Sequence, residues 1–264
     1  MKLPRKKLLS GSNNQIEIEI EELLCNAERA LNNWESYWSD FLSAPLQEEI
    51  IQRINNLHDL NWAVDGGYEG AERKKILFIP YQKEKFASTK PSLIAGIRIE
   101  GNFLFDRPSI IEIRSAIEHC GIQPNQLGDI WICNDRRAEA VCTTEIANKL
   151  NATTGRIREI VFHCEAITSS ELNLPVRRST KRFITVEASR RIDALASAGF
   201  GISRARIVKE IQGGKLRLNW IPVKQTSREL HEGDRIQLEE RGSVEIISLQ
   251  STKRQRWRVE LLRN

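Results

Sequence analysis

The sequence predicts an α+β protein of three parts. Apolar residues recur at helical spacing in the N-terminal segment, strand-like and helix-like segments alternate in the middle, and a polar stretch precedes a basic C-terminal third. We therefore expect an N-terminal helical unit over residues 1–74, a central α/β sandwich over 75–168, a linker over 169–182, and a C-terminal domain over 183–264 built of two helices and a small sheet.

Two amphipathic helices account for the first part. Between Ile20 and Phe41, apolar residues recur every three or four positions, as one face of a helix requires. The pattern restarts after Ser43, which can cap a helix, and Pro45 suits the first turn of that helix. The sequence therefore predicts a small helical unit.

The central part alternates between short strands and helices. The strand-like segments are ILFIPY, SLIAGIRIE, DIWICN, EAVCT and REIVFHCEAI, and the helix-like segments are SIIEIRSAIEHCGI and TEIANKL. Strands alternating with two helices indicate a sandwich of the ferredoxin-like or RNA-recognition-motif-like (RRM-like) type.

Hydropathy and cysteine usage exclude several classes of protein. No apolar run approaches the roughly 18 residues of a membrane span, and the cations of MKLPRKKLLS are not followed by the apolar core of an export signal. Five widely spaced cysteines without a C-x-x-C pair indicate neither a disulfide framework nor a zinc site. We expect a cytoplasmic protein with no membrane association, bound metal or cofactor.

Positive charge is concentrated in the C-terminal third. Residues 181–264 hold 18 Lys and Arg against 10 Asp and Glu, a net charge of +8, so the preceding residues carry −3 of the chain's total of +5. The expected partner of this third is a polyanion.

The cations of this third lie on the outer faces of two short helices. The first helix is EASRRIDALASAGF, in which Asp193 is expected to pair with a neighbouring Arg, and Ser203 can cap the second. On the second helix we expect Ala205, Ile207, Val208 and Ile211 to be buried, and Arg206 and Lys209 to face outward. Arg204 belongs to the apolar side of the first turn, so its guanidinium must extend past the helix end.

Two strands repeat this arrangement. In KLRLNW, the residues Leu216, Leu218 and Trp220 alternate with Lys215, Arg217 and Asn219, and in KRQRWRVELL the apolar residues alternate with arginines. Charged outer faces are typical of any soluble domain. However, their repetition and the excess of Arg over Lys favour binding of phosphates, since guanidinium can bind a phosphate in a bidentate manner.

These residues resemble the S-four RNA-binding domain, named after ribosomal small-subunit protein four. Its pattern of R-x-D, SR opening a helix, I-x-x-G-x-(V/L)-x-(V/L)-N and EGD is matched by Arg191–Asp193, Ser203–Arg204, IQGGKLRLN and Glu232–Asp234. GGYEGAER and LGDIWI outside this domain, and LNWIPV directly after its second helix, resemble the YlmH-type family, including its cyanobacterial and plastid branch called photosystem II S-four-domain proteins.

The resemblance implies a non-enzymatic bacterial protein, of the cyanobacterial type, that binds structured rRNA or tRNA on the large ribosomal subunit and acts in translation or ribosome-associated quality control. DNA is not an expected partner. The RNA-binding candidates are Arg190, Arg191, Ser203, Arg204, Arg206, Lys209, Lys215, Arg217 and Asn219, and the candidates for secondary contacts are Arg177, Arg178, Lys181, Arg182, Arg254, Arg256 and Arg258.

Two alternatives remain open at this level. The first is an RNA-modifying enzyme of the pseudouridine synthase or methyltransferase class, although the chain has no Gly-rich cofactor loop after a strand. The second is a ribosome-docking adaptor for which RNA binding is secondary. In that case GGYEGAER is either a turn or a functional loop, and its GYEG matches the backbone clamp of KH domains superficially.

Overall fold

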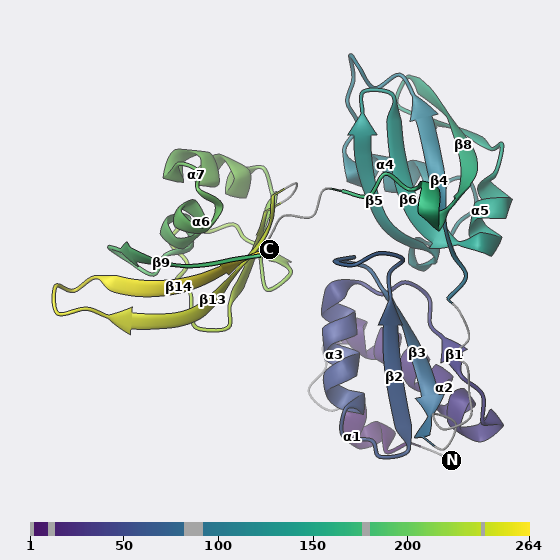
Figure 1. The fold of residues 1–264 in the computed structure, drawn as a ribbon, viewed down its shortest axis with the longest axis horizontal. Coiled ribbons are helices and arrows are strands. Elements are labelled where there is room, and N and C mark those ends of the chain that lie inside the picture. Colours follow the sequence, from purple (N-terminus) through teal and green to yellow (C-terminus); the bar gives the residue numbers. More distant parts are fainter. Residues whose placement is uncertain (1–2, 10–13, 82–91, 176–179, 239–240) are drawn as a thin grey trace. The chain divides into compact units, whose positions relative to one another are not determined.

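The computed structural model describes residues 3–9, 14–81, 92–175, 180–238 and 241–264. The chain divides into two compact units, Met1–Pro175 and Val176–Asn264 (Figure 1). Each unit has its own apolar core, and three antiparallel sheets give the chain the expected α+β class.

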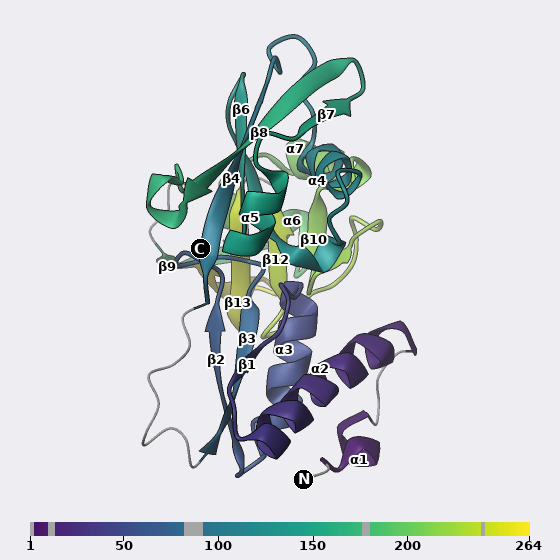
Figure 2. The same ribbon diagram turned by 90° about the vertical axis from the view of Figure 1, so that its right-hand side faces the viewer.

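Unit 1 begins with two long helices over a three-stranded sheet of order β1-β3-β2. Figure 2 shows α2 and α3 together over one face of this sheet, where Ile20, Ile50 and Phe78 are fully buried. The elements are α1 (Arg5–Leu9), α2 (Asn14–Asn33), β1 (Tyr37–Trp38), α3 (Ala44–Ile54), β2 (Leu60–Asp65) and β3 (Lys75–Pro80).

The structure corrects two expectations about this part. The segment ILFIPY forms β3, which pairs with β2 rather than with the central sheet, so the N-terminal fold extends past residue 74 and is not purely helical. The first helix ends at Asn33, and Trp34 adopts a left-handed conformation (φ 52°) that turns the chain into β1. The second helix begins after Ser43 with proline in its first turn, as predicted.

The central sheet has the strand order of the ferredoxin-like fold. Its order is β5-β6-β4-β8-β7. The four strands of the β-α-β-β-α-β motif are β4, β5, β6 and β8 in chain order, and they lie in the sheet as second, third, first and fourth. Strand β7 is added at the edge, next to β8. Helices α4 and α5 cover one face. The elements are β4 (Ile94–Gly101), α4 (Ile110–Glu118), β5 (Leu127–Asn134), β6 (Arg137–Thr143), α5 (Thr144–Leu150), β7 (Thr154–Ile157) and β8 (Ile160–Thr168), with short 3₁₀ turns at Pro124–Gln126 and Ser169–Glu171.

The start of the expected linker belongs to unit 1. Buried Glu139 on β6 accepts hydrogen bonds from the backbone N (2.7 Å) and side-chain Nδ2 (2.9 Å) of Asn173, and Trp131 Nε1 donates to the Asn173 carbonyl (2.9 Å). Leu172 is also buried. The segment 169–173 therefore covers part of the sheet face opposite the helices.

The two sheets of unit 1 are joined at Asp129. Its carboxylate accepts hydrogen bonds from the Tyr68 hydroxyl (2.7 Å) and from the backbone N atoms of Glu72 (2.7 Å) and Arg73 (2.9 Å). Arg73 in turn donates to the carbonyl oxygens of Leu127 (3.0 Å), Phe41 and Pro124. Burial and the Asp129 charge raise the pKa of Tyr68, so the phenol remains a donor. The segment GGYEGAER is thus a structural joint rather than an open loop.

Unit 2 is a six-stranded sheet with two helices over one face, in the order β11-β10-β12-β13-β14-β9. Its core holds Ile192, Leu195, Ile207 and Leu216. The elements are β9 (Lys181–Glu187), α6 (Ile192–Phe200), α7 (Arg204–Gln212), β10 (Leu216–Leu218), β11 (Ile221–Pro222), β12 (Arg235–Leu238), β13 (Gly242–Ser251) and β14 (Trp257–Arg263).

We expect Asp129→Ala to lower the free energy of unfolding of unit 1 by about 2–4 kcal/mol, because three donors lose their acceptor at once. Urea unfolding followed by circular dichroism measures the change. The control is Asp135→Ala, at an exposed turn. Equal stability of the two variants would show that the joint is not held by Asp129.

Candidate RNA-binding surface

The two helices of unit 2 are positioned by their connecting turn. Helix α6 ends at Gly201, which adopts the left-handed conformation (φ 67°) that favours glycine. Ser203 then caps α7, as predicted, because its hydroxyl accepts a hydrogen bond from the backbone N of Arg206 (3.3 Å). The Ser203 hydroxyl therefore orients α7.

The predicted pair between Asp193 and an arginine is confirmed. Asp193 is only 8% exposed, and Arg191 donates to both of its carboxylate oxygens, through Nε (3.1 Å) and Nη2 (3.4 Å). A buried carboxylate without such a partner is costly. Arg191 therefore serves first to hold the start of α6.

Arg190 is also held inside the domain. Its guanidinium donates twice to Glu229 Oε2, at 3.0 and 2.5 Å, and lies 5.3 Å from the centre of the Trp257 ring. These contacts fix the guanidinium in place and compensate part of its charge. Arg190 and Arg191, both predicted RNA contacts, thus have structural partners.

Asn219 occupies a turn and not the strand that its sequence pattern predicts. Strand β10 ends at Leu218, and Asn219 and Trp220 both have positive φ (47° and 71°), so Trp220 does not continue the buried row. The Asn219 side chain donates to Asp234 Oδ1 (2.7 Å) and accepts from the backbone N of Arg235 (2.8 Å). Asp234 accepts a further hydrogen bond from the backbone N of His231 (2.8 Å). The Asn219 amide therefore closes the turn.

Three of the predicted cations remain exposed without such a partner. In the described part of the chain, no hydrogen bond or ion pair engages the side chains of Arg204, Lys209 and Lys215, and all three are exposed. The backbone N of Lys215 donates to the Glu210 carbonyl (2.9 Å), so β10 begins directly after the last turn of α7. Arg217 is exposed on β10. We name Arg204, Lys209, Lys215 and Arg217 the α7–β10 surface.

The second helix differs from its predicted pattern at Ala205 and at Val208, which is only half-buried, whereas Arg206 faces outward as predicted. Ala205 is exposed rather than buried, because the buried arc is narrower and centres on Ile207 and Ile211. Arg206 pairs with Glu210 one turn away (2.5 Å). Arg206 thus behaves as an ordinary surface charge of a helix.

The secondary candidates are dispersed. Arg177 and Arg178 lie outside the described residues. Lys181 is exposed on β9, and Arg182 beside it pairs with Glu260 (2.6 Å). Arg254 and Arg256 lie in the turn between β13 and β14 and not on a strand, whereas Arg258 is exposed on β14.

The central sheet offers no open aromatic platform of the kind on which RRM domains stack bases. Its one tryptophan, Trp131, is 9% exposed and meets Tyr68 edge to face (5.8 Å between ring centres). The neighbouring positions on this face include Glu139 and the ion pair of Arg98 with Glu165 (2.6 Å). The candidate surface is therefore assigned to unit 2.

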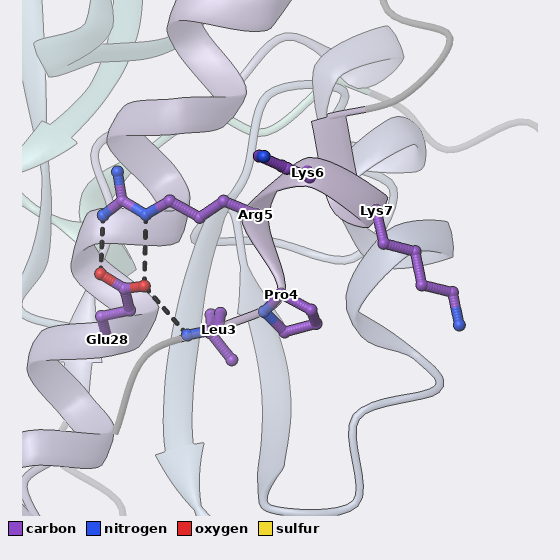
Figure 3. A pocket seen from close by; sticks show the side chains of 6 residues that line it. All are labelled: Leu3, Pro4, Arg5, Lys6, Lys7 and Glu28. Atoms are coloured by element: carbon purple, nitrogen blue, oxygen red, sulfur yellow. Dashed lines mark hydrogen bonds and ion pairs between the residues drawn. The ribbon is translucent and has the colours of Figure 1, made fainter.

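A shallow pocket near the N-terminus, which the sequence did not indicate, is lined by none of the predicted residues (Figure 3). Arg5 bridges to Glu28 at its centre, through Nε (3.2 Å) and Nη2 (2.6 Å), and the backbone N of Leu3 donates to the same carboxylate (3.0 Å). The pair of Arg5 with Glu28 thus anchors α1 to α2. Within the described residues no cluster of His, Cys, Asp or Glu is arranged to hold a metal ion, and no helix is long and apolar enough to span a bilayer.

We expect Asn219→Ala to lower the free energy of unfolding of unit 2 by about 2 kcal/mol, because Asp234 and the Arg235 amide lose their partner. Asn219→Gly loses the same hydrogen bonds but tolerates positive φ, so it is expected to be about 1 kcal/mol more stable than the Ala variant. Urea unfolding of both variants measures the difference. A structural role for Asn219 is refuted if the Ala variant matches the wild-type protein.

Comparison with known proteins agrees with this division of the chain. Residues 16–81 match the family model described as "YlmH, N-terminal", and residues 190–236 match the model described as "S4 domain". The chain is 25% identical over 223 residues to ribosome-associated protein quality control protein P2 of Bacillus subtilis (strain 168), which covers 84% of each chain. A solved structure, cell division protein ylmH from Streptococcus pneumoniae, aligns with a TM-score of 0.43 and 14% identity over 61% of this chain and 94% of its own. Unit 1 thus holds a segment that matches the YlmH N-terminal model, and unit 2 holds a segment that matches the S4 domain.

Proposed function

We propose that the protein binds structured RNA through the α7–β10 surface and acts without catalysing a reaction. The observation that supports this most directly is the set of exposed cations, Arg204, Lys209 and Lys215, that have no internal partner among the described residues. All three lie inside the segment that matches the S4 domain. Their charge is therefore available to an external anion.

The chemistry of this surface suits the phosphates of folded RNA. These cations are carried by a helix and by the strand that follows it, and such ordered elements can hold phosphates at fixed spacing. The base edges of A-form RNA lie in a deep, narrow groove that side chains do not reach. Recognition should therefore depend on the shape of the RNA more than on its sequence.

We further propose that the RNA is rRNA or tRNA on the large ribosomal subunit, and that the protein acts in translation or ribosome-associated quality control. The role named for the Bacillus subtilis relative, which the chain matches over most of its length, supports this step. A bacterial cytoplasmic location follows from the same proposal. Membership of the cyanobacterial or plastid branch stays a prediction from the resemblance.

We expect the triple variant R204Q/K209Q/K215Q to lose roughly 30-fold or more of its affinity for rRNA or tRNA at about 0.1 M salt, because it loses about three phosphate contacts. The wild-type slope of log affinity against log salt is expected at roughly −3 to −5 for about five contacts, and the variant slope at about 2 units shallower. Filter binding over a salt series measures both quantities. Arg206→Gln should have a smaller effect than the partner-free cations, since Arg206 already pairs with Glu210.

The matched control is R107Q/R136Q/R156Q, which removes the same charge from exposed positions of unit 1. This control should keep the wild-type affinity and salt slope. The proposal fails if the α7–β10 variant binds as the wild-type protein does, or if the control loses as much affinity.

One observation favours the adaptor as a second function of unit 1. Phe105 is 90% exposed in the loop between β4 and α4, and Leu104 and Ile111 nearby are 53% and 69% exposed. Arg158 pairs with both Asp106 and Glu112, so this loop and the start of α4 form one ordered corner. An ordered, exposed apolar corner is typical of a protein-docking site.

Phe105→Ser distinguishes the adaptor from the RNA-binding function. If this corner docks a protein, the variant should lose co-sedimentation with ribosomes while its affinity for purified RNA stays at the wild-type value. Unchanged co-sedimentation would remove the adaptor from consideration.

A further inference from the structure

We propose that the turn between β13 and β14 is a second RNA-phosphate contact, separate from the α7–β10 surface and engaged by RNA helices long enough to reach both. This inference rests on the proposed RNA-binding function and goes beyond it, because it assigns a site on the opposite end of the sheet. We name residues 252–256 the hairpin tip.

The hairpin tip is an ordered turn. The backbone N of Thr252 donates to the Arg256 carbonyl (2.7 Å), and the backbone N of Arg256 donates to the Thr252 hydroxyl (3.1 Å). Gln255 takes the left-handed position of the turn (φ 55°), and its backbone N donates to the Thr252 carbonyl (3.0 Å). The side chains between these bonds are therefore presented from a fixed backbone.

The charge of the tip is uncompensated. From Ser251 to Arg258 the chain holds Lys253, Arg254, Arg256 and Arg258 and no acidic residue. The first three are exposed, and among the described residues no hydrogen bond or ion pair involves their side chains.

The carboxylates on the adjoining strands already have partners. Glu187 pairs in register with Trp257 and accepts a hydrogen bond from the Thr185 hydroxyl (2.8 Å). Glu260 pairs with Arg182 (2.6 Å). Three exposed cations on one ordered turn that itself holds no acidic residue create a positive potential that favours an external polyanion.

The base of the hairpin lies next to the start of α6, because Trp257 contacts Arg190. The Arg190 guanidinium lies over the Trp257 ring at 5.3 Å from its centre, on the side of the sheet that α6 covers. The start of α6 and the hairpin tip therefore lie at the same end of the sheet, where Glu229 compensates part of the Arg190 charge.

The register of the sheet gives the separation of the two sites. Arg217 on β10 pairs with Gln237, and Gln237 pairs with Ser243 near the start of β13, whereas the tip begins at Thr252. At about 3.3 Å per residue along β13, the tip lies roughly 25–30 Å from the level of Arg217. Figure 1 shows the β13–β14 hairpin extending along the sheet away from the helices. A ligand that touches both sites must therefore be an extended polyanion, and a double-helical RNA stem is such a ligand.

The test compares K253Q/R254Q/R256Q with the wild-type full-length chain on two RNA hairpins. One has a stem of about 16 base pairs, the length that a double-stranded-RNA-binding domain spans, and the other has a stem of about a third of that length. The substitutions keep Thr252 and Gln255, so the turn retains its backbone bonds. On the long stem we expect the variant to lose roughly tenfold or more in affinity and about 2 units of salt slope, and on the short stem to stay within about twofold of wild type.

Two results would overturn the inference: undiminished affinity for the long stem, or the same loss on both stems. R107Q/R136Q/R156Q controls for the removed charge. R204Q/K209Q/K215Q is measured in parallel, because it should lose affinity for both stems. If that variant binds both stems as wild type does, the proposed function has failed. If only the result expected for K253Q/R254Q/R256Q is not found, the hairpin-tip inference fails and the proposed function is unaffected.

Discussion

The proposed binding surface of unit 2 depends on how the domain satisfies its own carboxylates. Asp193 is buried and must be paired, and Arg191 supplies that pair. Asp234 is bound in the same way by the Asn219 amide. These two interactions fix the start of α6 and the turn after β10, and α7 and its cations lie between them in the chain. If either carboxylate lost its partner, the start of α6 or the turn after β10 would be destabilised, and with it one end of the segment that carries the surface.

This requirement divides the residues of the S-four-type pattern into two groups. Arg191, Asp193, Asn219 and Asp234 have partners inside the domain and maintain its shape. Arg204 and the lysines after it have none among the described residues and face solvent. Some residues of this sequence pattern therefore maintain the fold, and others form an exposed basic surface. The structure is needed to tell the two groups apart. In unit 1 a carboxylate has the same structural role, because Asp129 accepts hydrogen bonds from the GGYEGAER segment and so connects the two sheets.

Features that depend on local periodicity were predictable from the sequence. The cap at Ser203, the pair of Arg191 with Asp193 and the strand order of the central sheet were all expected and are found. The strand ILFIPY was also recognised, but its partner was not, because an apolar strand carries no local signal that selects one sheet over another. Strict alternation predicted a strand through Trp220, whereas the hydrogen bonds of Asn219 to residues far along the chain favour a turn there. The partner of Arg190 could not be located in advance for the same reason, since Glu229 is distant in sequence. The pair of Arg206 with Glu210 was within reach of the sequence, because Glu210 is the only acidic residue between 194 and 228 and lies one helical turn after Arg206.

The most direct test of the account is ultraviolet crosslinking of the full-length protein to RNA in cells, with sequencing of the recovered RNA and identification of the crosslinked peptides. The account predicts fragments of rRNA or tRNA attached to peptides that span residues 204–217. Crosslinks confined to residues 3–175, or recovery of no rRNA or tRNA, would contradict it.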